Sequence, residues 1–224
     1  AHCISSAVDA IRNGSQDIVF AGGGEELHWT LSVLFDAMGA MSSKYNDTPE
    51  RASRAYDAER DGFVIAGGGG MVVIEDMDHA LARGATIYAE VKGYGMSGDA
   101  YHITAPAEDG DGGFRAMEAA LKRAGLTPVD IDYVNAHGTS TPLGDLIEAG
   151  AVRRLLGDAV GNASMSSTKS ATGHLLGAAG AIEAIYSVKT VQTGDLPPTL
   201  NLEDPEEAVA DFDLVPLVTK NRKV

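Results

Sequence analysis

Two short segments carry the residue types best suited to chemistry. One runs from His137 to Pro142 with the sequence His-Gly-Thr-Ser-Thr-Pro, and the other from Lys169 to His174 with the sequence Lys-Ser-Ala-Thr-Gly-His. Two histidines with a nearby lysine can do acid–base work on a carbonyl compound and can stabilise negative charge on its oxygen. Neither segment has an evident nucleophile close to it in the sequence.

Each of these residues also has a simpler interpretation. His137 is either a structural histidine or a ligand-binding one, and the small polar residues that follow it favour function. His174 precedes a segment rich in glycine and alanine that is expected to be helical. The positive end of a helix dipole keeps an imidazole neutral, and a neutral ring donates one hydrogen bond to a carbonyl oxygen. Lys169 either tunes a histidine's charge or lies on the surface.

The elements that must position the two segments alternate between strands and helices. Residues 131–135 read as a strand leading to His137, and residues 165–167 as a short strand leading to Lys169. A helix follows each, which is the usual place for a site in an open α/β sheet. The alternation predicts an α/β fold in layers around a largely buried sheet.

The remaining elements follow from hydrophobic periodicity and from glycine positions. The four glycines of residues 67–70 permit close backbone packing or a phosphate cradle, and the absence of a following P-loop lysine favours packing. Helices are expected over residues 4–11, 31–41, 77–83, 114–124 and 177–193 and around 146–155. Strands are expected over residues 17–21, 63–66, 71–75 and 85–94, with 63–66 and 71–75 pairing around the glycines. Loops are expected over residues 46–62, on the surface, and 107–113.

Composition excludes several classes of protein. The 224 residues carry a net charge of −15, which argues against nucleic-acid binding because phosphate contacts need a basic face. Cys3 is the one cysteine, so no internal disulfide forms and a reducing, cytoplasmic compartment fits. No signal peptide or membrane span is evident. His137, His174 and Glu148 lack the spacing of a metal motif, so no metal is expected.

Taken together, five segments resemble the β-ketoacyl-[acyl-carrier-protein] synthases, and most closely the type I elongating enzymes of bacterial fatty acid synthesis. The segments run across nearly the whole chain in the order of the family, and their combination is specific although a single glycine run is not. They are residues 22–26 (Gly-Gly-Gly-Glu-Glu), 35–40 (Phe-Asp-Ala-Met-Gly-Ala), 60–70 (Arg-Asp-Gly-Phe-Val-Ile-Ala and four glycines), 137–142 and 169–177.

The resemblance implies the thiolase fold, a layered α/β sandwich of two similar halves, each with a five-stranded sheet, in a protein that is usually a homodimer. In this chain the fold would be incomplete: residues 1–84 would form the end of the first half, and residues 85–224 most of the second. It also implies decarboxylative Claisen condensation of an acyl thioester with malonyl-[acyl-carrier-protein], and so an acyl carrier protein as partner. The phosphopantetheine arm arrives on that partner, so no separate cofactor is expected.

The resemblance also assigns roles to particular residues. His137 and His174 would hold the malonyl thioester oxygen, promote decarboxylation and stabilise the enolate, and Lys169 would support them electrostatically. The hydroxyl residues Thr139 and Thr141 would bind the phosphopantetheine arm. The remaining assignments are Phe35 and Phe63, which would line or gate the acyl pocket, and Glu148, which would belong to a buried polar network near a monovalent cation.

Two parts of the family pattern are missing from this sequence. Cys3 matches a later cysteine in an Ala-His-Cys triplet, so the family's nucleophilic cysteine is expected a few residues before Ala1. The closing Gly-Phe-Gly-Gly loop has no counterpart before Val224. We therefore expect a segment of a synthase that is active in a longer protein. The alternatives are a segment that only decarboxylates malonyl thioesters, and a non-catalytic subunit that partners a synthase.

Overall fold

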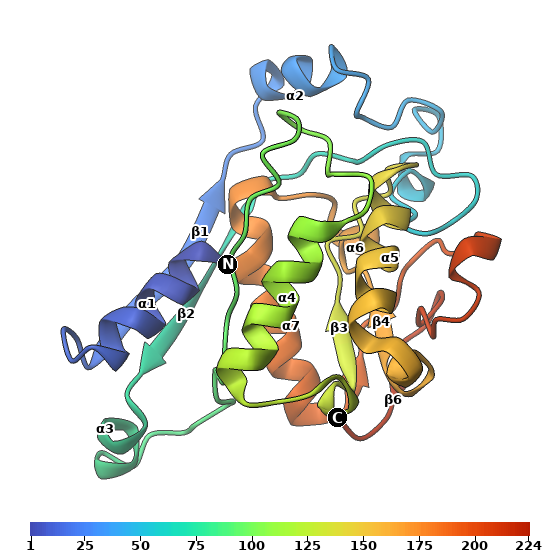
Figure 1. Ribbon diagram of the computed structural model, residues 1–224. Coiled ribbons are helices and arrows are strands. Elements are labelled where there is room, and N and C mark those ends of the chain that lie inside the picture. Colours follow the sequence, from blue (N-terminus) through green and yellow to red (C-terminus); the bar gives the residue numbers. More distant parts are fainter.

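The computed structural model describes residues 1–224 as helices around three separate pairs of strands (Figure 1). The α-helices are α1 (His2–Arg12), α2 (Trp29–Asp36), α3 (Met77–Ala82), α4 (Asp111–Ala124), α5 (Gly144–Leu156), α6 (Lys169–Thr172) and α7 (Ala179–Thr193). The strands are β1 (Ile18–Glu25), β2 (Gly68–Glu75), β3 (Tyr133–Asn135), β4 (Ser164–Ser166), β5 (Asp195–Leu196) and β6 (Lys220–Asn221). Short 3₁₀ turns are η1 (Pro49–Arg51), η2 (Pro128–Asp130), η3 (Gly157–Asn162), η4 (Leu176–Ala178) and η5 (Glu207–Val209).

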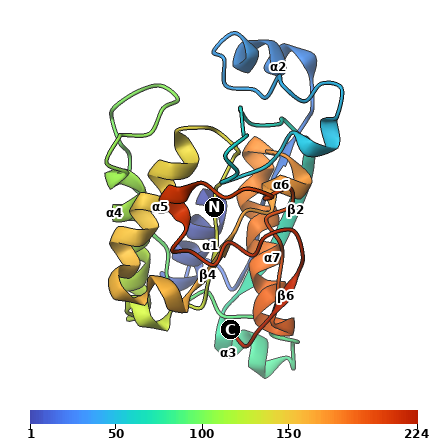
Figure 2. The same ribbon diagram turned by 90° about the vertical axis from the view of Figure 1, so that its right-hand side faces the viewer.

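The pair β3–β4 positions both chemistry-bearing segments. The strands are parallel, with Tyr133 opposite Ser164 and Asn135 opposite Ser166. Because parallel strands end at the same edge, the chain leaves β3 toward His137 and leaves β4 toward Lys169 on one side of the molecule. Figure 2 shows β4 between α4 and α5 on one side and α7 on the other. The sequence predicted both strands and the motif that follows each, but not that the two strands would pair with each other.

The main hydrophobic core lies beneath this edge. Its buried members come from the loop before residue 57, from α5, from β4 and from the C-terminal segment, with Tyr56, Val152, Met165 and Val209 among them. Helix α4 packs against α5, and Met117, from its predicted apolar stripe, packs on the core. Helix α4 ends where Gly125 adopts φ +68°, a left-handed conformation that glycine accepts without strain.

The antiparallel pair β1–β2 is longer than the sequence predicted because both strands continue through their glycines. Gly23 lies opposite Gly70, and Gly24 opposite Gly69. A Cβ on Gly22 would come 2.1 Å from the Gly70 carbonyl oxygen, so the glycines permit close packing of main chain against main chain. Helices α1 and α7 pack against this pair.

Three expectations about segments 46–94 were wrong. Residues 63–66 do not pair with 71–75, since β2 pairs with β1, while Phe63 and Ile65 form single bridges with Met41 and His174. Residues 85–94 form no strand although they alternate, because no neighbouring main chain offers them a ladder of hydrogen bonds.

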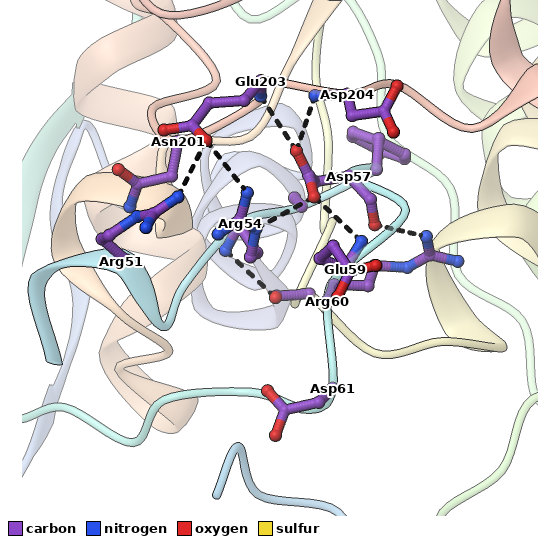
Figure 3. Close-up of polar contacts among 12 residues, drawn as sticks. Arg51, Arg54, Asp57, Glu59, Arg60, Asp61, Asn201, Glu203 and Asp204 are labelled. Carbon is purple, nitrogen blue, oxygen red and sulfur yellow. Dashed lines mark hydrogen bonds and ion pairs between the residues drawn. The ribbon is translucent and has the colours of Figure 1, made fainter. Parts of the chain in front are cut away.

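The third error concerns the burial of residues 46–62: residues 46–51 are exposed as predicted, but most of residues 52–62 are buried. Arg54, Asp57 and Arg60 in this loop are each at most 5% exposed. Buried charges are tolerated when they are paired, and Figure 3 shows Arg54 and Asp57 facing each other with Arg60 beside them. The helices agree with prediction except at their ends; for example, α2 ends at Asp36. None of the helices is long and apolar enough to span a membrane.

Candidate active site

The structure brings the two histidines together. The rings of His137 and His174 meet edge to face, with 5.2 Å between their centroids and 88° between their planes. His137 follows β3 directly, whereas His174 is fixed by the segment beside it. Its N–H donates to the Val64 carbonyl at 2.7 Å, and its carbonyl accepts the Ala66 N–H at 3.0 Å.

The proton on the neutral His174 ring is assigned by its surroundings. The backbone N–H of Leu176 donates to Nδ1 of His174 at 3.2 Å. A nitrogen that accepts a hydrogen bond carries no proton in the neutral ring, so the proton lies on Nε2. His174 therefore presents Nε2–H as a hydrogen-bond donor.

Both imidazoles are held neutral. The pKa of His137 is lowered to about 4, first by desolvation among its neighbours and then by the charge of Lys169. Part of the residue still faces solvent. For His174, desolvation comes first, then His137, then Lys169, and together they lower its pKa to about 3. Two neutral rings side by side can donate hydrogen bonds to one developing oxyanion.

Lys169 is buried at the start of α6 and forms an ion pair with Glu183 of α7. Burial raises the pKa of Glu183, and the nearby lysine opposes that shift. Lys169 acts on both histidines through its charge, since it lowers the pKa of each. The ion pair fixes the position from which that charge acts.

Glu148 of α5 holds the turn that carries His137. Its Oε1 accepts the backbone N–H of His137 at 2.6 Å, and its Oε2 accepts that of Gly138 at 2.7 Å. The Tyr56 hydroxyl donates to Oε2 at 3.3 Å from below. Both carboxylate oxygens are thus engaged by the protein itself. Gly138 is required at this turn, because a Cβ there would lie 2.7 Å from the Ser167 Cβ.

The two threonines lie on the loop that follows the turn. Thr139 Oγ1 is 3.2 Å from Thr141 Oγ1, so the hydroxyls point to the same place. Between them Ser140 is fully buried with φ +71°, and its Oγ accepts the Arg54 N–H at 3.0 Å. The Thr141 N–H donates to Asp145 at 3.2 Å.

The two phenylalanines continue the line of rings that begins with the histidines. Phe63 meets His174 edge to face at 5.6 Å and meets Phe35 in the same manner at 5.2 Å. Phe63 is buried and Phe35 is half-buried. The row Phe35–Phe63–His174–His137 therefore passes from an apolar region to the pair of ring donors.

Sequence reasoning missed several residues that shape this site. Glu183, Tyr56, Asp145 and Arg60 bond to the site residues or to their loops. The available signal for Glu183 was that it is the one acidic residue in the helix Ala179–Thr193. Tyr56 and Arg60 reach the site through contacts distant in sequence, which no local pattern reveals, whereas Asp145 contacts Thr141 four residues before it.

Comparison with known families identifies the class of protein to which this layered fold and its pair of histidines belong. The model of the "Beta-ketoacyl synthase, N-terminal domain" matches residues 1–80, and that of the "Beta-ketoacyl synthase, C-terminal domain" matches residues 88–203. The chain belongs to the β-ketoacyl synthase family.

Characterised relatives match along the whole chain. It is 56% identical over 225 residues to 3-oxoacyl-[acyl-carrier-protein] synthase 2 of Rhizobium meliloti (strain 1021), covering 100% of this chain and 53% of that protein. It is 56% identical over 215 residues to 3-oxoacyl-[acyl-carrier-protein] synthase 1 of Escherichia coli (strain K12), covering 96% of this chain and 51% of that protein. The chain thus spans about half the length of the curated relatives it matches.

Solved structures confirm the thiolase-like fold. A β-ketoacyl synthase from Burkholderia phymatum STM815 matches with a TM-score of 0.93 and 40% identity, over 99% of this chain and 53% of that one. A second solved structure matches with a TM-score of 0.95 and 37% identity, over 98% of this chain and 54% of that chain. It is described as "AntDE:AntF (apo): type II PKS acyl-carrier protein in complex with its ketosynthase bound to the hexaketide".

Proposed function

We propose that this chain forms the malonyl-activating part of a β-ketoacyl-[acyl-carrier-protein] synthase that elongates fatty acids. The observation that carries the proposal is the neutral pair of imidazoles, of which His174 presents Nε2–H. Two ring N–H groups side by side can stabilise the negatively charged oxygen of a thioester enolate by donating hydrogen bonds to it.

The reaction proceeds in two stages. In the first, the bond between the malonyl carboxylate and Cα breaks, carbon dioxide leaves, and the electron pair stays on Cα as an enolate. His137 and His174 hold the thioester oxygen, on which negative charge develops. In the second, the enolate carbon attacks an acyl thioester carbonyl, a carbon–carbon bond forms, and the thiolate leaves. Desolvation, together with the charge of Lys169, keeps both rings neutral throughout.

The other residues bind substrate in this proposal. Thr139 and Thr141 hold the phosphopantetheine arm with their adjacent hydroxyls, and Phe35 and Phe63 line the acyl pocket. The arm arrives on an acyl carrier protein, and the chain uses no separate cofactor. Support for that partner comes from the matched ketosynthase described in complex with an acyl-carrier protein.

The proposal extends to the setting of the protein. Residues 1–84 belong to one thiolase-like half and residues 85–224 to the other, supported by the boundaries of the two matched family models. The protein works as a homodimer in the cytoplasm, in keeping with the resemblance and with Cys3 as the one cysteine.

Release of carbon dioxide from malonyl-[acyl-carrier-protein] by the polypeptide of the complete reading frame tests the first stage. We expect release that is lost in the variant His174→Ala and retained in a control that changes an exposed residue, Lys189→Met. Release equal to that of buffer, together with no condensation by the polypeptide of the complete reading frame, contradicts the proposal and favours a non-catalytic partner subunit. Release without condensation favours a decarboxylase.

A further inference from the structure

Arg60 belongs to the charged cluster of Figure 3 and also forms hydrogen bonds with the loop Thr139–Pro142, which carries the two threonines. Its Nε donates to the Thr141 carbonyl at 3.0 Å, and its Nη2 donates to the Pro142 carbonyl at 2.5 Å. Its Nη1 donates to the Asp57 carbonyl at 2.8 Å and to Glu206 Oε1 at 2.6 Å. Its side chain is 1% exposed.

The planar guanidinium explains why an arginine stands here. Its three nitrogens point in fixed directions, so Nε and Nη2 hold two successive carbonyls of the loop. At the same time Nη1 holds the Asp57 carbonyl and the Glu206 carboxylate. A lysine ammonium carries charge but cannot reproduce this fork.

Asp145 clamps the same loop from the opposite direction. Its Oδ1 accepts the Thr141 N–H at 3.2 Å, and its Oδ2 lies 3.5 Å from Arg60 Nε. Burial raises the pKa of Asp145 to about 6, and the charge of Arg60 opposes that shift. The arginine and the aspartate therefore fix Thr141 through its carbonyl and its N–H together.

We propose that Arg60 is a positioning residue, which holds the loop Thr139–Pro142 in the conformation that brings both threonine hydroxyls to the thioester-bearing arm. The inference rests on the proposed function, because it assigns Thr139 and Thr141 to that arm. Arg60 itself does not touch the substrate. Its effect is on binding, since His137 and His174 are held by other residues, Glu148 and the main chain at Val64.

Binding of malonyl-pantetheine to the 224-residue chain, followed by calorimetry, tests the proposal with the variant Arg60→Lys. We expect the dissociation constant to rise about tenfold, the loss of roughly one charge-assisted hydrogen bond. In carbon dioxide release, KM should rise by a similar factor while kcat stays within about twofold. The matched control is Arg51→Lys, whose guanidinium forms an exposed pair with Glu203 and does not reach the loop. This control should bind like the wild type.

A second variant covers the case in which Arg60→Lys does not fold. Glu206→Gln leaves Arg60 in place but removes the carboxylate that holds Nη1, and Glu206 is partly exposed. We expect a rise of about two- to threefold in the dissociation constant. An unchanged constant in both folded variants, or in Glu206→Gln alone if the other does not fold, overturns the proposal.

Backbone amide spectra separate this inference from the proposed function. In Arg60→Lys, the resonances of Thr139 and Thr141 should shift while those of α7 stay in place. Failure of the wild-type chain to bind malonyl-pantetheine contradicts the proposed function. Shifted loop resonances in Arg60→Lys support the positioning role even in that case. Loop resonances that coincide with those of the wild type overturn the positioning role.

Discussion

The backbone N–H of Leu176 points at Nδ1 of His174 across 3.2 Å, and this contact decides which nitrogen of the ring carries its proton. Leu176 adopts φ +45°, a left-handed conformation that is unfavourable for leucine. The fold accepts this strain at the residue that sets the tautomer, as is common at functional sites.

The first prediction concerns that tautomer. At neutral pH, His174 should exist as the Nε2–H form, because Nδ1 is occupied as an acceptor. Long-range proton–nitrogen correlation spectra distinguish the two nitrogens directly. A resonance pattern of the Nδ1–H form would contradict the assignment, and with it the direction in which His174 donates.

The second prediction concerns the pH at which the two rings take up protons. The pKa of His137 is lowered to about 4 and that of His174 to about 3, in each case chiefly by desolvation. Both should still be mostly neutral at pH 5, where an ordinary histidine with a pKa of 6.5 is mostly charged. Titration of the ring C–H resonances measures this, and midpoints near 6.5 would refute it.

These shifts have a defined effect on stability. Between about pH 3 and pH 6.5 the unfolded chain binds more protons at these histidines than the folded chain does. Their contribution to the free energy of unfolding is therefore complete above pH 6.5 and is lost as the pH falls. Asp145 acts in the opposite direction, since its pKa is raised to about 6 by burial and its ionisation lowers stability as the pH rises.

The sequence predicted those parts of the fold that depend on local pattern. The apolar stripe of Phe114 and Met117, ended by Gly125, and the strand before His137 required no knowledge of distant residues. The meeting of His137 with His174 was expected from the family resemblance, whereas the contacts of His174 with Val64 and Ala66, which fix it there, were not predicted. The conformation of residues 85–94 was not, since alternation gives a strand only where another strand lies beside it.

The buried charges were unpredictable for a related reason. Arg60 reads as a surface residue in a polar loop, and its partner Glu206 lies far away in the sequence. Glu183 has the same relation to Lys169 across two helices. Pairing of this kind is specified by the tertiary fold, so composition and spacing do not reveal it.

The third prediction tests the electrostatic role of Lys169. Its charge lowers the pKa of both histidines, so Lys169→Met should raise both values toward 6.5. The shift should be partial, because desolvation is the larger cause at each ring. Lys189→Met removes an equal charge from an exposed position on α7 and should leave both midpoints in place. Equal shifts in the two variants would exclude a specific role for Lys169.

The fourth prediction concerns Glu148. The variant Glu148→Ala leaves the N–H groups of His137 and Gly138 without their acceptor, and should lower the free energy of unfolding by about 1–3 kcal/mol. Glu148→Gln keeps one acceptor oxygen and should lose less. Urea titration of the two variants gives the comparison. If the glutamine variant is the less stable one, an acceptor oxygen at this position is not what stabilises the turn.

The fifth prediction concerns Gly23, in the C-terminal half of β1. A Cβ on Gly23 would lie 2.2 Å from the Gly177 carbonyl oxygen, so Gly23→Ala must displace the turn η4 that contains Leu176. We expect a loss of about 1–3 kcal/mol in thermal or urea unfolding and a change in the His174 tautomer signal. Gly161→Ala is the control, because nothing lies within 4 Å of its Cβ. An unaltered His174 spectrum in Gly23→Ala would show that η4 is not coupled to this strand.

The ladder between β3 and β4 has only three rungs, yet it sets the distance between the two motifs. The mostly exposed turn η3, which connects α5 to β4, can change in length without altering that distance, because lengthening a surface loop costs little free energy. A slip of one residue in the ladder, by contrast, would move one motif along the other and turn the side chains of the slipped strand to the other face. The site is therefore tolerant of insertions along the chain and intolerant of errors in pairing, so a family with this core can vary its loops widely while its chemistry stays the same.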